Sequence, residues 1–169
     1  EHNYKELQLN SQLRDVLLKL DDLTSQQRES EKQRKLRENV SLLSKLFPKG
    51  AIKGLVSDLV RPSKQKYENA LLTILGMNFD SIIIESSTIA YKCIEILKER
   101  RLGTATFIPL DSIAIEPINL NYLRSLDENV LPGVDILEYD DKAIEQAVQY
   151  VVGDSLVVEN IDVARNLKW

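Results

Sequence analysis

The sequence predicts an α/β (α+β) domain, a mixed sheet with flanking helices, preceded by one coiled-coil helix. Two observations support this. Residues 1–47 hold no proline or glycine and carry apolar residues at heptad spacing. From Gly50 onward, short apolar runs alternate with capped amphipathic segments. Pro48 and Gly50 separate the two parts, because proline ends a helix and glycine allows a turn. We therefore expect an arm over 1–47 and a domain over 48–169.

The arm carries an apolar stripe whose members are spaced by alternating steps of four and three residues. These members are Leu9, Leu13, Val16, Leu20 and Leu23. Such spacing predicts a helix that pairs with another helix. No apolar residue occurs from 24 to 35, although most of these residues are good helix formers, and the stripe resumes at Leu36 out of phase. A continuous helix would be about 70 Å long and would extend beyond a small domain. The plainer alternative is a surface helix followed by a polar loop.

The first half of the domain predicts two strands, each followed by a helix. Residues 54–60 are expected to form the first strand, and Ser63 to cap a helix that Gly76 ends. The inward face of that helix would hold Tyr67, Ala70, Leu71 and Ile74. The apolar run 79–85 predicts the second strand. Ser86 or Ser87 then caps a helix that Gly103 ends, with an inward face of Ala90, Cys93, Ile94 and Leu97.

The second half predicts three more strands, over 104–110, 134–139 and 155–158. Residues 116–133 are expected to be irregular or to form a short helix. A helix ended by Gly153 should follow the fourth strand, with Ile144, Ala147, Val148 and Val151 inward. Asn160 is the expected cap of a last helix, whose apolar residues are Ile161, Ala164 and Leu167.

The composition excludes several classes of protein. With 169 residues, 43% apolar and 28% charged, the chain is globular. No apolar run approaches the roughly 18 residues of a membrane span, and the first residues are not a signal peptide. Cys93 is the single cysteine and His2 the single histidine, which leaves no internal disulfide and no histidine-based triad or zinc site. Neither nucleotide-binding glycine motif occurs. The sequence therefore predicts no enzyme, cofactor or metal site.

A few side chains are candidates for catalysis. Cys93 lies on the apolar face of its predicted helix and is interpreted as a packed thiol. Adjacent carboxylates such as Asp140 and Asp141 point in different directions, and are interpreted, like Asp21 and Asp22, as caps or surface charges. Asp111 follows a strand end, where α/β enzymes often place an acid, but an N-cap is the plainer interpretation.

Charge is divided unevenly along the chain. The net charge is −4, yet residues 1–101 hold 18 Lys and Arg against 14 Asp and Glu, and residues 102–169 hold 4 against 12. Five basic residues, with only Asp58 among them as an opposing charge, cluster where the arm meets the domain. They are Lys49, Lys53, Arg61, Lys64 and Lys66. They are candidates for non-specific contacts to DNA phosphates, and an ordinary solvated surface is the alternative.

Several motifs of the domain resemble one known family. Residues 53–59 (KGLVSDL), 66–70 (KYENA) and 79–85 (FDSIIIE) are similar to the hinge domain of the structural maintenance of chromosomes (SMC) proteins. Residues 103–111 (GTATFIPLD) and 147–158 (AVQYVVGDSLVV) are most similar to the cohesin members of that family. The resemblance covers residues 50–169, and the preceding heptads fit the coiled-coil arm that enters such a hinge.

The resemblance implies an architectural function. The family's hinge has two similar subdomains, so the chain would hold one arm end and the first subdomain, as a piece of a longer protein. Its hinge would join the hinge of cohesin's other SMC subunit and close a ring that holds DNA, in the nucleus and on the chromosome. The arm stripe would pair with the returning helix of the same subunit, and the basic cluster would touch DNA. The family's ATP-binding motifs lie in head domains far along the coils.

Two other functions remain open at this point. The first is an α/β regulatory domain on a signalling coiled coil, with Asp111 and the neighbouring loop lining a small-molecule pocket. The second is a hydrolase that uses Asp111 and Cys93, which the missing base disfavours.

Overall fold

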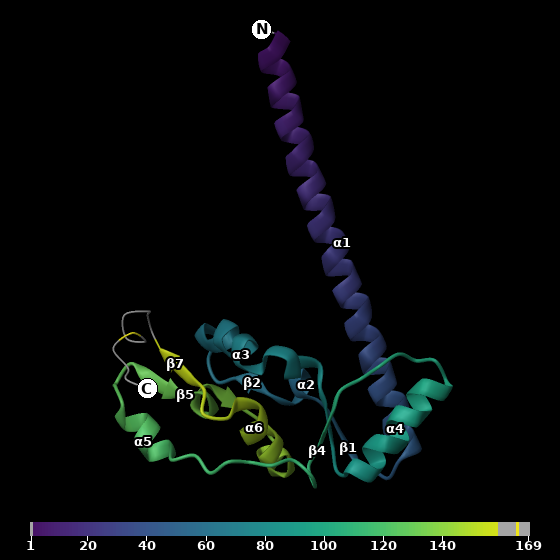
Figure 1. The fold of residues 1–169 in the computed structure, drawn as a ribbon, viewed down its shortest axis with the longest axis vertical. Helices are drawn as coiled ribbons and strands as arrows, with labels where there is room; N and C mark the ends of the chain where they lie inside the picture. Colours follow the sequence, from purple (N-terminus) through teal and green to yellow (C-terminus); the bar gives the residue numbers. More distant parts are fainter. Residues whose placement is uncertain (1, 159–164, 166–169) are drawn as a thin grey trace. The chain divides into compact units, whose positions relative to one another are not determined.

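The computed structural model of the chain describes residues 2–158 and residue 165 (Figure 1). Its contacts divide the chain into two compact units, Glu1–Glu38 and Asn39–Trp169. The predicted boundary at residue 48 stays a prediction, since the last turns of the first helix are counted with the second unit. The helix expected from Asn160 lies outside the described residues, apart from residue 165.

The first element, α1, is one helix from His2 to Leu46. It continues through the polar stretch 24–35, so the alternative of a polar loop is wrong. Good helix formers and the absence of proline and glycine account for this continuity. Within the second unit, Leu43 is fully buried and the side-chain amide of Asn39 donates a hydrogen bond of 3.0 Å to the carbonyl of Leu102. These contacts anchor the end of α1 in the domain.

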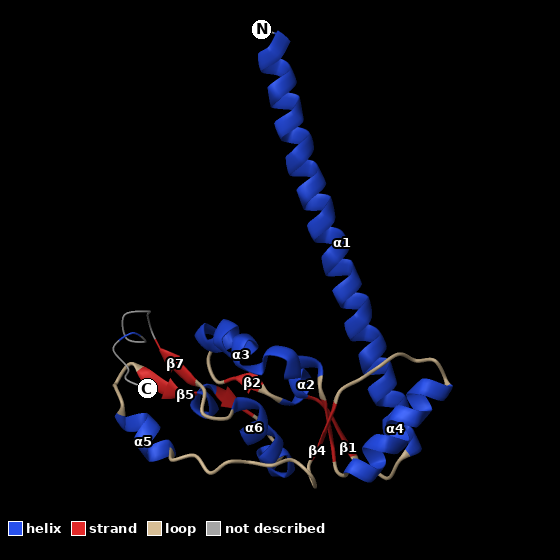
Figure 2. Cartoon of the chain, viewed as in Figure 1, coloured by secondary structure: helices blue, strands red, loops and turns tan. Residues whose placement is uncertain are grey.

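A three-stranded mixed sheet lies at the centre of the second unit (Figure 2). Its strands are β1 (Ile52–Leu55), β3 (Ile82–Ile84) and β4 (Phe107–Pro109), in the order β1-β3-β4. β1 runs antiparallel and β4 parallel to the central β3. All three residues of β3 are buried, so both faces of this strand are covered. The predicted α/β fold with a mixed sheet is confirmed.

Helix α4 (Ser87–Glu99) connects the parallel strands β3 and β4. As predicted, Ser86 caps it, its hydroxyl accepting a hydrogen bond from the Ile89 amide at 3.3 Å. Ala90, Cys93 and Leu97 are buried. Ile94, expected to face inward, is 46% exposed, because it sits at the margin of the apolar face. The helix ends before Gly103, with Arg101 in the left-handed region at φ 54°.

The first predicted strand, 54–60, is largely wrong. β1 ends at Leu55, and the chain turns into the short helix α2 (Val56–Leu59) before β2 (Arg61–Pro62). The register of β1 against β3 is shifted at Gly54, whose φ of +128° favours glycine. Pairing with β3 continues through Gly54 and Leu55, and the chain then turns into α2, where the amide of Val60 bonds to the carbonyl of Val56 at 3.0 Å.

The helix expected after Ser63 forms later than predicted. A 3-10 turn, η1 (Gln65–Tyr67), leads into α3 (Glu68–Leu75). Ser63 does not cap it; its amide donates instead to the carbonyl of Ile136 at 2.8 Å. Gly76, at φ +49°, ends α3 as predicted. A further 3-10 segment, η2 (Gly76–Asp80), includes the first two residues of the strand expected over 79–85. That strand is therefore shorter than predicted and forms only as β3.

The rest of the chain forms short elements around a second pair of strands. After α5 (Leu120–Ser125), the strand β5 (Val130–Pro132), which was not predicted, pairs antiparallel with the predicted β7 (Leu156–Val158). Only β6 (Leu137–Glu138) remains of the strand expected over 134–139, because η3 (Gly133–Ile136) occupies its first half. β6 pairs with β2. η4 (Lys142–Ile144) and α6 (Glu145–Val152) follow, and Gly153 ends α6 as predicted.

The main core lies between the sheet and the helices α3 and α6. Ile83 of β3 and Ile108 of β4 face it, together with the buried faces of the two helices. The predicted inward residues are part of this core or pack against it, and they are Tyr67, Ala70, Leu71, Ile74, Ile144, Ala147, Val148 and Val151. Ile82 and Ile84 alternate to the other face of β3, on the side of α4. The central strand therefore holds two layers of helices together.

Candidate functional site

The five basic residues chosen from the sequence do not form one uniform cluster. Lys49 lies in the turn after α1 and Lys53 on β1, and the Lys53 ammonium lies against Gly50, 3.9 Å from where a Cβ there would stand. Lys66 lies in η1 and Lys64 directly before it, ahead of α3. Lys49, Lys64 and Lys66 are exposed, and Lys53 is half-buried. The Lys53 ammonium therefore lies beside the turn that holds Lys49 and Gly50.

Arg61 differs from the four lysines because its charge is paired. Its guanidinium donates to both carboxylate oxygens of Asp140, at 2.9 and 3.1 Å, and lies 3.4 Å from the Glu138 carboxylate. These hydrogen bonds lower the pKa of the Asp140 carboxyl below its ordinary value. They raise the pKa of the Arg61 guanidinium above its ordinary value. The pairing of β2 with β6 creates this contact. Sequence reasoning missed the two carboxylates because they lie far along the chain.

Lys66 has a neutral neighbour of its own. Its ammonium lies 5.1 Å from the centroid of the Tyr67 ring, within the range of a cation–π contact. Lys66 stays exposed and can still meet a phosphate. The tyrosine is half-buried against the core, so it provides no free platform on which a base could stack.

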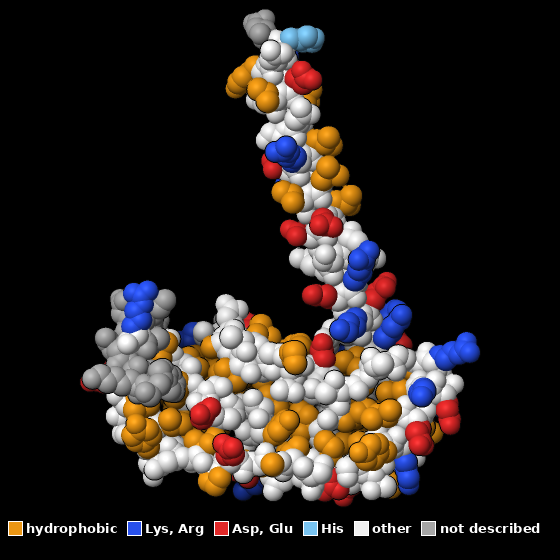
Figure 3. All heavy atoms as spheres, in the orientation of Figure 1, with side chains coloured by type: hydrophobic (Ala, Val, Ile, Leu, Met, Phe, Trp, Pro, Cys, Tyr) orange, Lys and Arg blue, Asp and Glu red, His pale blue; other side chains and the backbone are white. Residues whose placement is uncertain are grey.

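The predicted pairing stripe of α1 is exposed along its whole length. The exposed fractions are 64% for Leu9, 58% for Leu13, 61% for Val16, 59% for Leu20 and 62% for Leu23. Further apolar side chains on the same part of the helix, among them Leu17 and Leu18, are exposed as well. Figure 3 shows these apolar groups gathered along the arm. Partner contact stays a prediction.

Asp111 caps a helix, although not the turn that follows it. One of its carboxylate oxygens accepts a hydrogen bond of 2.9 Å from the amide of Ser87, and the other lies 3.5 Å from the Ser87 hydroxyl. The carboxylate thus sits at the N-terminus of α4, where a negative charge is stabilising. It does not line the pocket beside the neighbouring loop, which counts against the ligand-binding role suggested for it.

Cys93 is fully buried on α4, and burial raises the pKa of its thiol to about 11. It is therefore a packed thiol rather than a nucleophile, which removes the suggested hydrolase. Asp141 caps η4 by accepting from the amide of Ala143 at 2.9 Å, and Asp140 pairs with Arg61. Both aspartates act as the predicted caps and surface charges.

Neither a metal cluster nor a membrane span is found in the described part of the chain. No group of three or more His, Cys, Asp or Glu side chains there could hold a metal ion. None of the described helices is both long and apolar enough to cross a bilayer.

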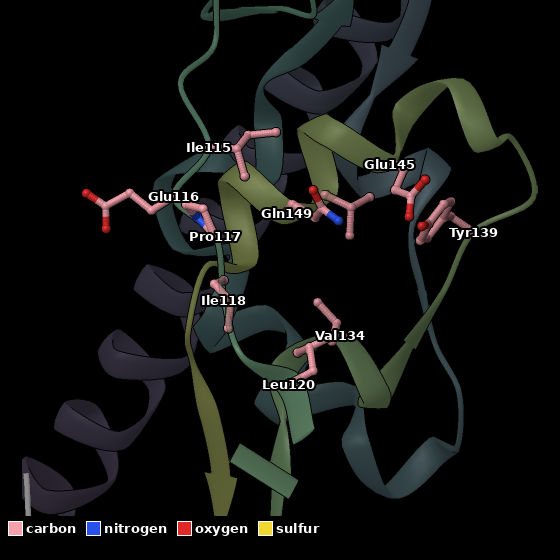
Figure 4. Close-up of a pocket in the computed structure, with 10 residues that line it drawn as sticks. Ile115, Glu116, Pro117, Ile118, Leu120, Val134, Tyr139, Glu145 and Gln149 are labelled. Carbon is pink, nitrogen blue, oxygen red and sulfur yellow. The ribbon is translucent and has the colours of Figure 1, made fainter. Parts of the chain in front are cut away.

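An apolar pocket of about 460 Å³ lies beside the loop that follows β4 (Figure 4). Ile115 and Ile118 border it from the loop, Val134 from η3, and Val148 and Gln149 from α6. The neighbouring loop thus lines a pocket as the alternative function required, although no catalytic constellation accompanies it.

Comparisons with known proteins agree on one family. The model of the SMC proteins flexible hinge domain matches residues 48–168. Structural maintenance of chromosomes protein 1 of Saccharomyces cerevisiae is 47% identical over 167 residues, which is 99% of this chain and 13% of the yeast protein. The chain thus spans a small part of the relatives that it matches.

Solved structures show the same likeness. One described as the folded elbow of cohesin superposes with a TM-score of 0.75 at 44% identity, covering 99% of this chain and 24% of that chain. An asymmetric dimer of the Geobacillus stearothermophilus SMC hinge domain superposes with a TM-score of 0.64 at 26% identity. The match covers 82% of this chain and 60% of that chain.

Proposed function

Because the chain belongs to the family of SMC flexible hinge domains, we propose that it forms the arm and first half of the hinge of a cohesin-type subunit. This hinge joins the hinge of cohesin's other SMC subunit and closes one junction of a ring that holds DNA. The ring acts on chromosomes in the nucleus, in sister chromatid cohesion and chromosome organisation. The role is architectural: the hinge makes and breaks no bond, and ATP hydrolysis belongs to head domains elsewhere in the longer protein.

The observation that carries the proposal is the combination of a hinge match over residues 48–168 with an unpartnered heptad stripe on α1. About three fifths of the surface of each stripe residue is exposed, an arrangement that water disfavours on an isolated helix. A returning helix of the same subunit would bury the stripe. The dimer described for the Geobacillus hinge supports association through this kind of domain.

DNA contact is proposed for four of the five basic residues. Within the part of the chain that the structure describes, Lys49, Lys53, Lys64 and Lys66 form no ion pair with a carboxylate, whereas Arg61 is paired with Asp140. Lysine binds phosphate as a point charge without reading bases, so the binding is non-specific and weakens with salt. Each lysine that contacts a phosphate contributes about 0.9 to the slope of log affinity against log salt concentration.

The first experiment measures hinge association. The protein, extended through the second half of the hinge, is mixed with the hinge of cohesin's other SMC subunit, and molar mass is measured by light scattering. A tight one-to-one complex supports the ring-junction role. Persistent monomers in the mixture contradict it.

A second experiment tests DNA contact. Lys49, Lys53, Lys64 and Lys66 are replaced together by glutamate, and DNA binding is followed by fluorescence anisotropy across a salt series. We expect weaker binding, a flatter salt dependence and an unchanged fold, since exposed substitutions cost little stability. The matched control replaces four other exposed lysines, Lys5, Lys19, Lys92 and Lys98. Equal binding by the two variants would remove the DNA role of these four residues.

A further inference from the structure

Residues 113–117, here called the strap, cross the surface between β4 and α5 without a strand partner. Ile113 and Ile115 are half-buried while Ala114 and Glu116 are exposed, the alternation of an extended segment. Among the described residues, no hydrogen bond involves a backbone amide or carbonyl of the strap. A row of unpaired backbone groups on an extended segment is a template for another strand.

Grooves border the strap on both sides. The pocket of about 460 Å³ lies between the strap, η3 and α6, and a second hollow of about 490 Å³ lies toward α5 and the end of α6. Both are lined by Ile115, Pro117, Ile118 and Gln149. Figure 4 shows Ile118, Val134 and Leu120 around the open space of the first groove, with Tyr139 and Glu145 at its far side. A peptide beside the strap would therefore find apolar space for alternate side chains.

The charged residues that the structure places along the two grooves are acidic. Glu116 and Glu145 line the first groove, Glu116 and Asp154 line the second, and no lysine or arginine is among the described residues that line either one. The nearby Arg124 is held in an ion pair with Asp135, at 2.7 and 2.8 Å. These carboxylates repel phosphate and attract cations, so a nucleic acid is disfavoured here and a basic peptide is favoured.

We propose that the strap and its first groove bind an extended peptide of a partner protein, with apolar residues at alternate positions and lysine or arginine at its ends. The peptide adds as a strand to the free backbone of residues 113–117. Its apolar side chains enter the groove over Val148, and its end charges meet Glu116 and Glu145. The proposal does not depend on hinge association or on DNA contact.

Six-residue probes of the form Lys-X-Thr-X-Thr-Lys, with X as Val, Ile, Leu or Tyr, test the proposal on the 169-residue chain. Each probe is compared with its partner Glu-X-Thr-X-Thr-Glu by isothermal titration, and amide hydrogen exchange is followed by NMR. We expect saturable binding, about fivefold tighter for the lysine probe because two exposed charge pairs form. Exchange should slow in the complex at alternate amides of the strap, either Ile113 and Ile115 or Ala114 and Glu116, because successive N–H groups of an extended segment point to opposite edges.

Charge-reversed variants sharpen the test. Glu116→Lys with Glu145→Lys should make the glutamate probe the tighter ligand. The control, Glu95→Lys with Glu99→Lys on α4, adds the same charge at exposed sites away from the strap and should keep the original preference. No saturable binding, equal affinity for both probe types, or slowed exchange confined to other segments would overturn the proposal. So would strap amides that are already protected in a free chain of dimeric mass, because a second copy would then occupy the strap.

Discussion

Replacing Gly133 by alanine should destabilise the domain through one identifiable overlap. A Cβ at this position would lie 2.7 Å from the Cγ1 of Val152, and 3.3 Å from both the Cδ1 of Ile74 and the carbonyl oxygen of Ser155. Carbon atoms pack at about 3.5–4.0 Å, so the new methyl group needs a displacement of about 1 Å. Gly133 and Val152 are both buried, which leaves little room for it.

The surrounding contacts set the size of the effect. Moving Gly133 away from Val152 strains its hydrogen bond to the carbonyl of Ser155, which is 2.7 Å long. Overpacking of this kind costs about 1–3 kcal/mol. At about 2 kcal/mol, the melting temperature should fall by about 8 °C for a domain of this size. Differential scanning calorimetry and urea unfolding measure the two quantities.

A double-mutant cycle tests the cause directly. Val152→Ala alone should cost about 2 kcal/mol, because it leaves a cavity in the core. In the double variant the alanine at position 133 fills part of that cavity and meets no Cγ1, so the total should be about 1–2 kcal/mol less than the sum of the single changes. A strictly additive double variant, or a Gly133→Ala protein as stable as the wild type, would refute the reasoning.

Three further predictions concern single side chains. Arg124 holds the pKa of Asp135 below its ordinary 3.8, so the pair stabilises above that pH and its contribution is lost as pH falls through the folded-state pKa. Asp135→Asn should therefore cost about 1 kcal/mol at pH 7 by urea unfolding, with the difference closing in acid; a constant difference would contradict this. Asp111→Ala should cost about 1 kcal/mol by losing the cap at Ser87, and Asp111→Asn less, since it keeps an acceptor; equal losses would argue against capping. Cys93 should not react with Ellman's reagent at pH 8 until urea is added, and fast native reaction would disprove its burial.

The helices with a strong local pattern could be predicted from the sequence. The continuity of α1, the cap of α4 at Ser86 and the end of α6 at Gly153 all follow from residues within a few positions of the element. Helical hydrogen bonds join neighbours in the chain, so periodicity, caps and breakers are sufficient evidence. The family resemblance and the separation of arm from domain rested on such local motifs.

The short strands depend on segments that are distant in the sequence. So does the pairing of a basic residue of the cluster with carboxylates. β1 pairs with β3 only as far as Leu55, and β5 exists because β7 pairs with it. The Arg61 guanidinium is held in an ion pair with Asp140, which is 79 residues away along the chain. A strand needs a partner and an ion pair needs its counter-charge, and neither is visible in a local pattern. The same holds for the strap: its residues are ordinary in sequence, and only the folded domain leaves their backbone unpaired between two acidic, apolar grooves.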